Sequence, residues 1–204
     1  TARLSSATVA AGGSAANTIA GVASFGARAA FVGKVKNDNL GTVFGHDIRA
    51  LKVAFDTPAA ADGPATACCY IMVTPDGERT MNTYLGAAQN LSPADIDPKQ
   101  IADAAITYLE GYLWDPPLAE QAFLKAANIA HGAGREISLS LSDPFCVQRY
   151  LKEFQDLVMN HVDVVFANEH EITALWETTD FDEAVRITQQ HCGLAAITRS
   201  AKGS

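Results

Sequence analysis

Hydrophobic positions in the first quarter of the chain follow helical and strand periods in turn. Between residues 14 and 25 the apolar side chains return at helical spacing, which predicts a helix with Ser14 as its N-cap and Gly26 just past its end. The apolar run 29–35 predicts a buried strand. Residues 41–51 place their apolar side chains on one face, which predicts a second helix.

A different pattern follows, rich in β-branched and aromatic residues. The runs 66–74 and 79–85 are joined by Pro75-Asp76-Gly77, a sequence that favours a tight turn. We therefore expect a β-hairpin, and we expect it to lie outside the main sheet. Residues 53–85 would form a small β domain around it.

From residue 104 onward, predicted strands and helices alternate. Strands are expected at 106–113, 137–141, 162–167 and 194–198. Helices are expected at 118–130, 145–160, 169–176 and 182–192. Strict alternation indicates right-handed crossovers, so the predicted fold class is α/β with a doubly wound, mostly parallel sheet. The main domain would comprise 1–52 and 86–204, incomplete at both ends, because the chain opens at a glycine-rich turn and closes on a strand that leaves for a loop.

Composition and charge exclude several kinds of partner. The chain has 204 residues and a formal net charge of −8, and its lysines and arginines are scattered. Because no basic stripe could release counterions, nucleic acid and anionic membranes are not expected partners. No apolar run is long enough to span a bilayer. The four cysteines lack metal-finger spacing and lie in apolar stretches, which indicates reduced core residues of a cytoplasmic protein. They are Cys68, Cys69, Cys146 and Cys192.

Four common enzyme signatures are absent from the sequence. They are the GxxxxGKS/T phosphate loop, the GxGxxG dinucleotide turn, the HExxH zinc helix and the GxSxG nucleophile elbow. A Rossmann-type oxidoreductase is therefore disfavoured.

A glycine pair, Gly12 and Gly13, comes directly before the first predicted helix. Free backbone N–H groups face outward at such a helix start, and small residues let a ligand approach closely. Asn17, in the first turn, could offer a donor and an acceptor to paired hydroxyl groups. An ordinary glycine turn with a capping serine is the alternative explanation.

Polar residues also follow strands of the predicted sheet, at the edge where open α/β sheets bind ligands. Asn168 and Glu171 open the helix after the strand 162–167, where a capping box accounts for their spacing and does not prevent them from facing a ligand. Glu110 ends an otherwise apolar strand, and such a carboxylate must be hydrogen-bonded or face a cavity. Asp143 also lies at a strand end, where Asp-Pro is common turn chemistry.

The stretch GGSAANTIAGVASFGARAAFVGKVKNDNLG, residues 12–41, resembles the first signature of the ribokinase (PfkB) family of kinases. In that signature a glycine pair, a nearby asparagine, a later Phe-Gly and a final GxxxxDxxG fall in this order. Residues 65–97, 106–117 and 139–154 look most like the bacterial adenosine kinase-like branch, whose sister branches act on fructose, ribose or aminoimidazole nucleosides. The resemblance covers nearly the whole chain and implies a ribokinase-like fold.

The resemblance implies roles for residues on the acceptor side. Gly12, Gly13 and Asn17 would hold sugar or ribose hydroxyls, and Glu110 would reach the same substrate. Asp38 fills the acidic position of the GxxxxDxxG segment, although a role as helix N-cap explains it equally well.

The resemblance also implies roles on the phosphate side. Asn168 and Glu171 match an N-x-x-E motif whose residues organise Mg²⁺ and phosphate through water. The loop after the last strand resembles a T-x-G-x-x-G loop that passes beneath the ATP phosphates and adenine. Its motif positions are Thr198, Ser200 and Gly203, with Ser200 in place of the first glycine.

The predicted hairpin corresponds in position to the family's β lid, which covers the substrate and excludes water. Four side chains could shape a base or sugar pocket from this lid, although lid packing explains them equally well. They are Cys68, Tyr70, Met72 and Met81. The lid could also join two copies of the chain in a homodimer.

The implied activity is Mg²⁺-assisted transfer of the γ-phosphoryl group of ATP to a hydroxymethyl group of a nucleoside, with adenosine favoured, or of a sugar. A catalytic aspartate of a GAGD motif would take the proton from the acceptor hydroxyl, and we expect it beyond Ser204. The alternatives are a fructokinase- or ribokinase-type sugar kinase and a non-catalytic sugar- or nucleoside-binding α/β module.

Overall fold

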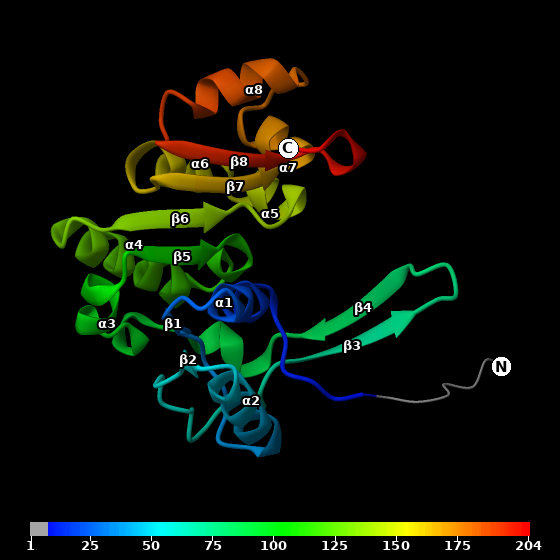
Figure 1. Cartoon of the computed structure of the whole chain (residues 1–204), viewed down its shortest axis with the longest axis vertical. Helices are drawn as coiled ribbons and strands as arrows, with labels where there is room; N and C mark the ends of the chain where they lie inside the picture. Colours follow the sequence, from blue (N-terminus) through cyan, green and yellow to red (C-terminus); the bar gives the residue numbers. More distant parts are fainter. Residues whose placement is uncertain (1–7) are drawn as a thin grey trace. The chain divides into compact units, whose positions relative to one another are not determined.

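The computed structural model describes residues 8–204 and divides into two compact units (Figure 1). The first unit ends at Leu91, and the second runs from Ser92 to Ser204. Among the described residues, no helix combines the length and the apolar character that crossing a membrane requires.

The first unit consists of two helices, two short parallel strands, a hairpin and a closing 3₁₀ turn. Its elements are α1 (Ser14–Ser24), β1 (Ala29–Ala30), α2 (Asn39–Ala50), β2 (Val53–Ala54), β3 (Cys68–Val73), β4 (Arg79–Tyr84) and η1 (Gly86–Asn90). The core between α1, α2, β1 and β2 is made of apolar side chains that include the ring cluster Phe31, Phe44 and Phe55.

The predicted strand 29–35 is wrong in its length. Only Ala29 and Ala30 pair with β2, and the ladder resumes as one isolated bridge between Lys36 and Ala60. The neighbouring segment between these contacts contains Pro58, which has no backbone N–H to donate. The apolar run is still packed, since Val35 is buried, but its backbone is not in a continuous sheet.

Helix α1 begins one residue away from the predicted position of its cap. Gly13 is the N-cap, with φ 115°, and Ser14 is already the first helical residue. No side chain caps this helix, so the prediction of Ser14 as N-cap is wrong. Gly26 follows the helix with φ 87°, a left-handed conformation that glycine adopts readily, as expected.

Strands β3 and β4 form a separate two-stranded antiparallel sheet, which confirms the predicted hairpin outside the parallel sheet. Figure 1 shows both strands extending away from β1 and β2 of their own unit. Tyr70 and Met72 share one face, whereas Met81 pairs with Ile71 on the other. The four lid side chains named from the sequence therefore do not line one surface.

The second unit is a parallel sheet with helical connections. Its elements are η2 (Pro93–Asp95), α3 (Pro98–Asp103), β5 (Ile106–Glu110), η3 (Gly111–Trp114), α4 (Pro117–Gly132), β6 (Glu136–Ser140), α5 (Pro144–Arg149), α6 (Leu151–Asn160), β7 (Val164–Asn168), α7 (Glu169–Leu175), α8 (Phe181–Thr188), β8 (Leu194–Thr198) and η4 (Ser200–Lys202). All neighbouring strands are parallel, in the order β5-β6-β7-β8 (Figure 1). The predicted α/β class with a parallel sheet is confirmed.

Two predicted elements of this unit are too long, and a third is interrupted. The strand that begins at residue 106 ends at Glu110, and Gly111 starts a 3₁₀ turn in which a Cβ would lie 2.8 Å from the Ser140 carbonyl oxygen. The predicted helix 145–160 is interrupted at Tyr150, whose φ of −122° and ψ of 41° are not helical. The helix predicted to reach residue 192 ends at Thr188.

The core of the second unit lies where the strands meet helices α4 to α7. Its fully buried side chains include Ile137, Leu139, Leu141, Val147, Phe154, Leu157, Val158, Val165, Ile172 and Leu175. The cysteines do not belong to it: all four are free thiols, but Cys69 is exposed and the other three are half-buried. Cys68 and Cys69 lie on β3, where every residue after Cys68 is exposed, so their predicted place in the core is wrong.

Candidate functional site

Polar side chains gather at the carboxyl edge of the parallel sheet in the second unit. Asn168, at the end of β7, lies directly opposite Thr198, at the end of β8. Glu110, at the end of β5, lies opposite Ser140 of β6. This is the edge at which parallel α/β sheets bind ligands, so the predicted residues of this unit lie on the expected side.

Asn168 and Glu171 form the capping box predicted from their spacing. The Asn168 side-chain oxygen accepts hydrogen bonds from the backbone N–H groups of His170 and Glu171, at 2.8 and 2.9 Å. In return, the Asn168 backbone N–H and side-chain amide donate to the two Glu171 carboxylate oxygens, at 2.9 and 2.7 Å. The box locks both side chains at the first turn of α7.

Glu171 is a buried carboxylate in an acidic neighbourhood. Glu171 as a whole is only 6% exposed. Burial raises the pKa of Glu171, and the nearby carboxylates of Asp143 and Glu110 raise it further, against the hydrogen bond from the Asn168 backbone. The Glu171 carboxyl group therefore keeps its proton to a higher pH than an exposed glutamate does.

Glu110 is held by hydroxyl groups on both sides. The Tyr108 hydroxyl donates to one carboxylate oxygen at 2.9 Å, and the Ser142 hydroxyl donates to the other in a short hydrogen bond. Ser142 itself sits in the left-handed region, with φ 68°. Such a conformation is strained for a residue with a side chain, and strained residues concentrate at functional sites. The sequence gives no signal for the role of Ser142.

Asp143 lies in the turn before α5, as its Asp-Pro sequence predicted, and serves as the N-cap of that helix. Its carboxylate caps α5 by accepting from the Phe145 backbone N–H at 2.7 Å. It also contributes negative charge near Glu171 and Tyr112, raising the pKa of the Tyr112 hydroxyl after the larger effect of burial.

The loop after β8 is a closed turn with two left-handed residues. The Arg199 backbone N–H donates to the Gly203 carbonyl at 2.7 Å. Ser200 has φ 52° and Gly203 has φ 86°. Ser200 therefore occupies a conformation that favours glycine, at the position where the resemblance expects one. Thr198, Ser200 and Gly203 are thus brought together in one loop beside Asn168.

In the first unit, the glycine pair leads into α1 as expected. Gly12 and Gly13 are exposed, and a Cβ at Gly12 would have open space around it. The Asn17 backbone donates to the Gly13 carbonyl at 2.8 Å, and the Asn17 side chain is exposed in the first turn. These three residues form one short surface with room for a ligand.

Asp38 anchors the first turn of α2 to the segment that leads into the hairpin. Its carboxylate accepts from the Gly41 backbone at 2.8 Å, from the Thr66 backbone at 2.9 Å and from the Thr66 hydroxyl at 2.7 Å. These hydrogen bonds, those from Thr66 first, lower the pKa of Asp38. The capping alternative is therefore confirmed, and the link to Thr66 was not visible in the sequence.

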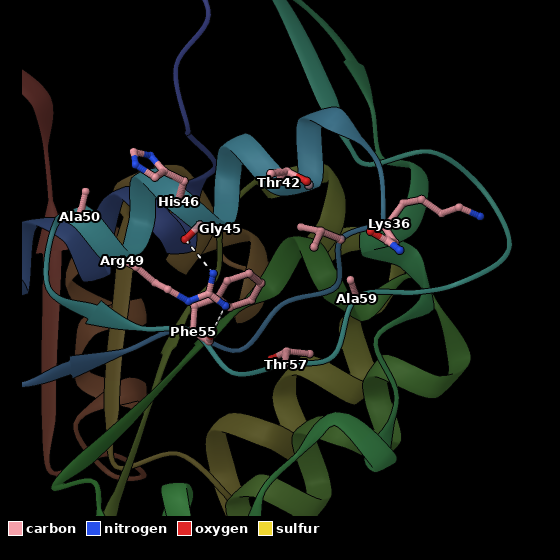
Figure 2. Close-up of a pocket in the computed structure, with 12 residues that line it drawn as sticks. Lys36, Thr42, Gly45, His46, Arg49, Ala50, Phe55, Thr57 and Ala59 are labelled. Carbon is pink, nitrogen blue, oxygen red and sulfur yellow. Dashed lines mark hydrogen bonds between the residues drawn. The ribbon is translucent and has the colours of Figure 1, made fainter.

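A pocket of about 710 Å³ lies elsewhere in the first unit (Figure 2). It is lined by α2 and the segment after β2, and the Arg49 guanidinium reaches across from α2 to the Phe55 carbonyl at 2.5 Å. Lys36 and His46 are among the residues that line it (Figure 2). None of Gly12, Gly13 and Asn17 lines it, so it is distinct from the predicted acceptor surface.

The residues predicted from the sequence fall into two groups, one in each unit. The first unit carries Gly12, Gly13, Asn17 and Asp38, and the second carries Glu110, Asn168, Glu171, Thr198, Ser200 and Gly203. Within the described part of the chain, no group of three or more His, Cys, Asp or Glu side chains could hold a metal ion.

Comparisons with known proteins agree on one family. A sequence profile of the pfkB family of carbohydrate kinases matches residues 1–204. The ATP-dependent ribose-1-phosphate kinase of Halopiger xanaduensis is 28% identical over 199 residues, covering 95% of this chain and 63% of that protein.

Two solved structures are more similar. The adenosine kinase of Sinorhizobium meliloti has 54% identity and a TM-score of 0.89, and the match covers 93% of this chain and 58% of that one. A probable sugar kinase of Rhizobium etli has 53% identity, the same TM-score and the same coverage. The chain thus spans about three fifths of the length of these relatives. The expected ribokinase-like fold is confirmed.

Proposed function

The chain belongs to the pfkB family of carbohydrate kinases, and on this premise we propose that the complete protein transfers the γ-phosphoryl group of ATP to a hydroxymethyl group of a nucleoside or sugar. The observation that carries the proposal is the carboxyl edge of the second unit. There the Asn168–Glu171 box stands directly beside Thr198 and its closed loop. ATP binding at this edge uses Asn168, Thr198, Ser200 and Gly203.

The favoured acceptor is adenosine. The support is the 54% identity to the S. meliloti adenosine kinase, which exceeds the 28% identity to the ribose-1-phosphate kinase. The 53% identity to a probable sugar kinase favours a free sugar as the second candidate. The residues proposed to bind the acceptor are Gly12, Gly13, Asn17, Asp38 and Glu110.

Mg²⁺ would enter with ATP and be held mainly by the nucleotide phosphates and water. Mg²⁺ keeps several water ligands and needs only one or two protein carboxylates. Glu171 is the carboxylate that orders this water, since Asn168 fixes both of its oxygens in place. When bound with ATP, Mg²⁺ would supply positive charge that offsets the negative charge of the phosphates. The catalytic base, an aspartate of a GAGD motif, is expected beyond Ser204.

The hairpin, within residues 53–85, acts as a lid over the acceptor and as the dimer contact. Both of its faces carry exposed apolar side chains: Tyr70 and Met72 are 73% and 43% exposed on one face, and Ile71 and Met81 are 51% and 57% exposed on the other. A hairpin of two strands is marginally stable alone in water. One face would cover the acceptor and the other would pack on a second copy. A cytoplasmic location fits the four free thiols.

Calorimetric titration of the complete protein tests the proposal. We expect saturable binding of ATP in the presence of Mg²⁺ and of adenosine, with ribose and fructose binding more weakly. Binding of adenosine or a sugar without any binding of ATP would contradict the kinase proposal and favour a non-catalytic binding module.

A further inference from the structure

Arg199 is the most highly connected residue of the loop after β8, and no motif in the sequence singles it out. Its backbone closes the loop by donating to the Gly203 carbonyl at 2.7 Å. Its side chain leaves the loop in the direction of α7 and α8, where it meets two different partners.

The first partner is Glu169, the first residue of α7. Arg199 Nε donates to Glu169 Oε2 at 3.0 Å, and Lys202 Nζ lies 3.8 Å from the other Glu169 carboxylate oxygen. The side chains of Arg199 and Glu169 are 33% and 27% exposed, so the pair is partly shielded from solvent. The hydrogen bond from Arg199 is the largest cause of the lowered pKa of Glu169. Glu169 is therefore ionised at neutral pH.

The second partner is Phe181, the first residue of α8. The guanidinium carbon of Arg199 lies 3.9 Å from the centre of the Phe181 ring, close enough for a cation–π contact. A planar guanidinium can stack on a ring and donate in its own plane at the same time, which a lysine cannot do. Arg199 thus ties the loop to the starts of two helices.

The loop needs these side-chain contacts because its backbone is strained. Ser200 has φ 52°, a left-handed conformation that disfavours any residue with a Cβ. Strained backbone persists only where the surroundings hold it in place. Within the loop, the Lys202 and Gly203 N–H groups also donate back to the carbonyls of Arg199 and Ser200, at 3.0 and 3.1 Å.

We propose that Arg199 is a positioning residue which, through Glu169 and Phe181, holds the loop of Ser200 and Gly203 in its strained conformation beside Asn168, ready for the nucleotide phosphates. That the ligand is a nucleotide rests on the proposed function, but the role of Arg199 in holding the loop does not. Arg199 acts through the loop backbone, and it need not touch ATP.

The first test uses the complete protein without any ligand. Amide hydrogen exchange is measured for the peptide that contains residues 199–203, in the wild type, in Arg199→Ala and in Arg199→Lys. We expect exchange to be about tenfold faster in Arg199→Ala and intermediate in Arg199→Lys, with global unfolding unchanged. The control is Arg186→Ala, which removes an exposed pair to Glu183 on α8 and should leave exchange in the loop unchanged. Equal exchange in Arg199→Ala and the wild type would overturn the inference.

The second test separates positioning from direct contact. We expect Arg199→Ala to raise the KM for ATP about tenfold, equivalent to about 1.4 kcal/mol, with the KM for the acceptor unchanged. A glycine at position 200 relieves the strain, so the double variant Arg199→Ala, Ser200→Gly should recover to within about threefold of the wild type. A double variant as poor as Arg199→Ala would show that Arg199 does not act through the loop.

The two hypotheses fail in different ways. If the wild type neither binds nor uses ATP, the proposed function is wrong, while hydrogen exchange still decides whether Arg199 holds the loop. If the wild type uses ATP and Arg199→Ala does so equally well, the proposed function stands and the role of Arg199 is wrong.

Discussion

Replacing Gly41 by alanine should break the contact that joins α2 to the segment before the hairpin. A Cβ at this position would lie 2.0 Å from the Lys36 carbonyl oxygen and 3.1 Å from the Thr66 hydroxyl. Non-bonded heavy atoms prefer separations of about 3.5 Å, so the Lys36 backbone must move by about 1.5 Å. That shift would disturb the bond from the Lys36 N–H to the Thr66 hydroxyl, 2.9 Å long, and the one from the Asp38 N–H to the Lys36 carbonyl, also 2.9 Å long.

The expected loss of stability follows from these two effects. Overpacking costs about 1–3 kcal/mol, and one lost net hydrogen bond adds about 1 kcal/mol, so the free energy of unfolding should fall by about 2–4 kcal/mol. Urea denaturation of the complete protein, followed by circular dichroism, measures this change. Because the same contact fixes Thr66, just before β3, the KM for the acceptor should rise while the KM for ATP stays constant.

Gly21→Ala is the matched control, because it makes the same change inside α1. A Cβ there would meet nothing within 4 Å. Alanine favours a helix interior over glycine by about 1 kcal/mol, so this variant should be as stable as the wild type or more stable. Stability of Gly41→Ala at the wild-type level, or an equal loss in both variants, would refute the steric reasoning.

Three further variants test individual residues. Asn17→Ala should weaken acceptor binding about tenfold to a hundredfold, since an unpaired polar site costs about 1–3 kcal/mol. Calorimetry should show ATP binding nearly unchanged, and equal losses for both ligands would indicate a folding defect. The pKa of Glu171 is raised, so the stability it contributes is present below its unfolded pKa of about 4.3 and is lost as the pH rises through the folded pKa. The stability of Glu171→Gln relative to the wild type should therefore grow from about pH 4 to neutral pH in urea titrations. The same variant should need more Mg²⁺ for turnover at saturating ATP, and an unchanged Mg²⁺ response would leave Glu171 with its capping role alone. The pKa of Asp38 is lowered, so its contribution is present above its unfolded pKa of about 3.9 and is lost as the pH falls through the folded pKa. Asp38→Asn should therefore lose less stability than the wild type as the pH falls. An equally steep loss in both proteins would contradict this role of Asp38.

The sequence predicted the alternation of strands and helices well because that signal is local. The spacing of apolar residues and the presence of turn residues identify a helix or strand from its own stretch of sequence. Its ends depend on partners that are distant in the chain. Residues 29–35 read as one strand, yet Pro58 in the neighbouring segment interrupts the ladder. Similarly, Gly111 starts a 3₁₀ turn in which a Cβ would lie 2.8 Å from the Ser140 carbonyl oxygen, a proximity that no periodicity reveals.

The same distinction applies to the candidate site. Asn168 and Glu171 are three residues apart, so their spacing alone predicted the capping box that the structure contains. The bonds from Thr66 to Asp38 and from Arg199 to Glu169 join residues 28 and 30 positions apart. The sequence gives one indirect indication of the Arg199–Glu169 pair, namely Ser200 at a position where the resemblance expects glycine.

The most direct test of the central claim is a transfer assay with the complete protein. ATP labelled at the γ-phosphorus is incubated with Mg²⁺ and with adenosine, ribose or fructose, and the products are separated by chromatography. We predict that the label moves to adenosine, giving a nucleoside 5′-monophosphate in amounts equal to the ATP consumed, and that the two sugars accept less. No label on any of the three acceptors, under conditions where ATP and adenosine both bind, would contradict the assignment of this protein as a kinase.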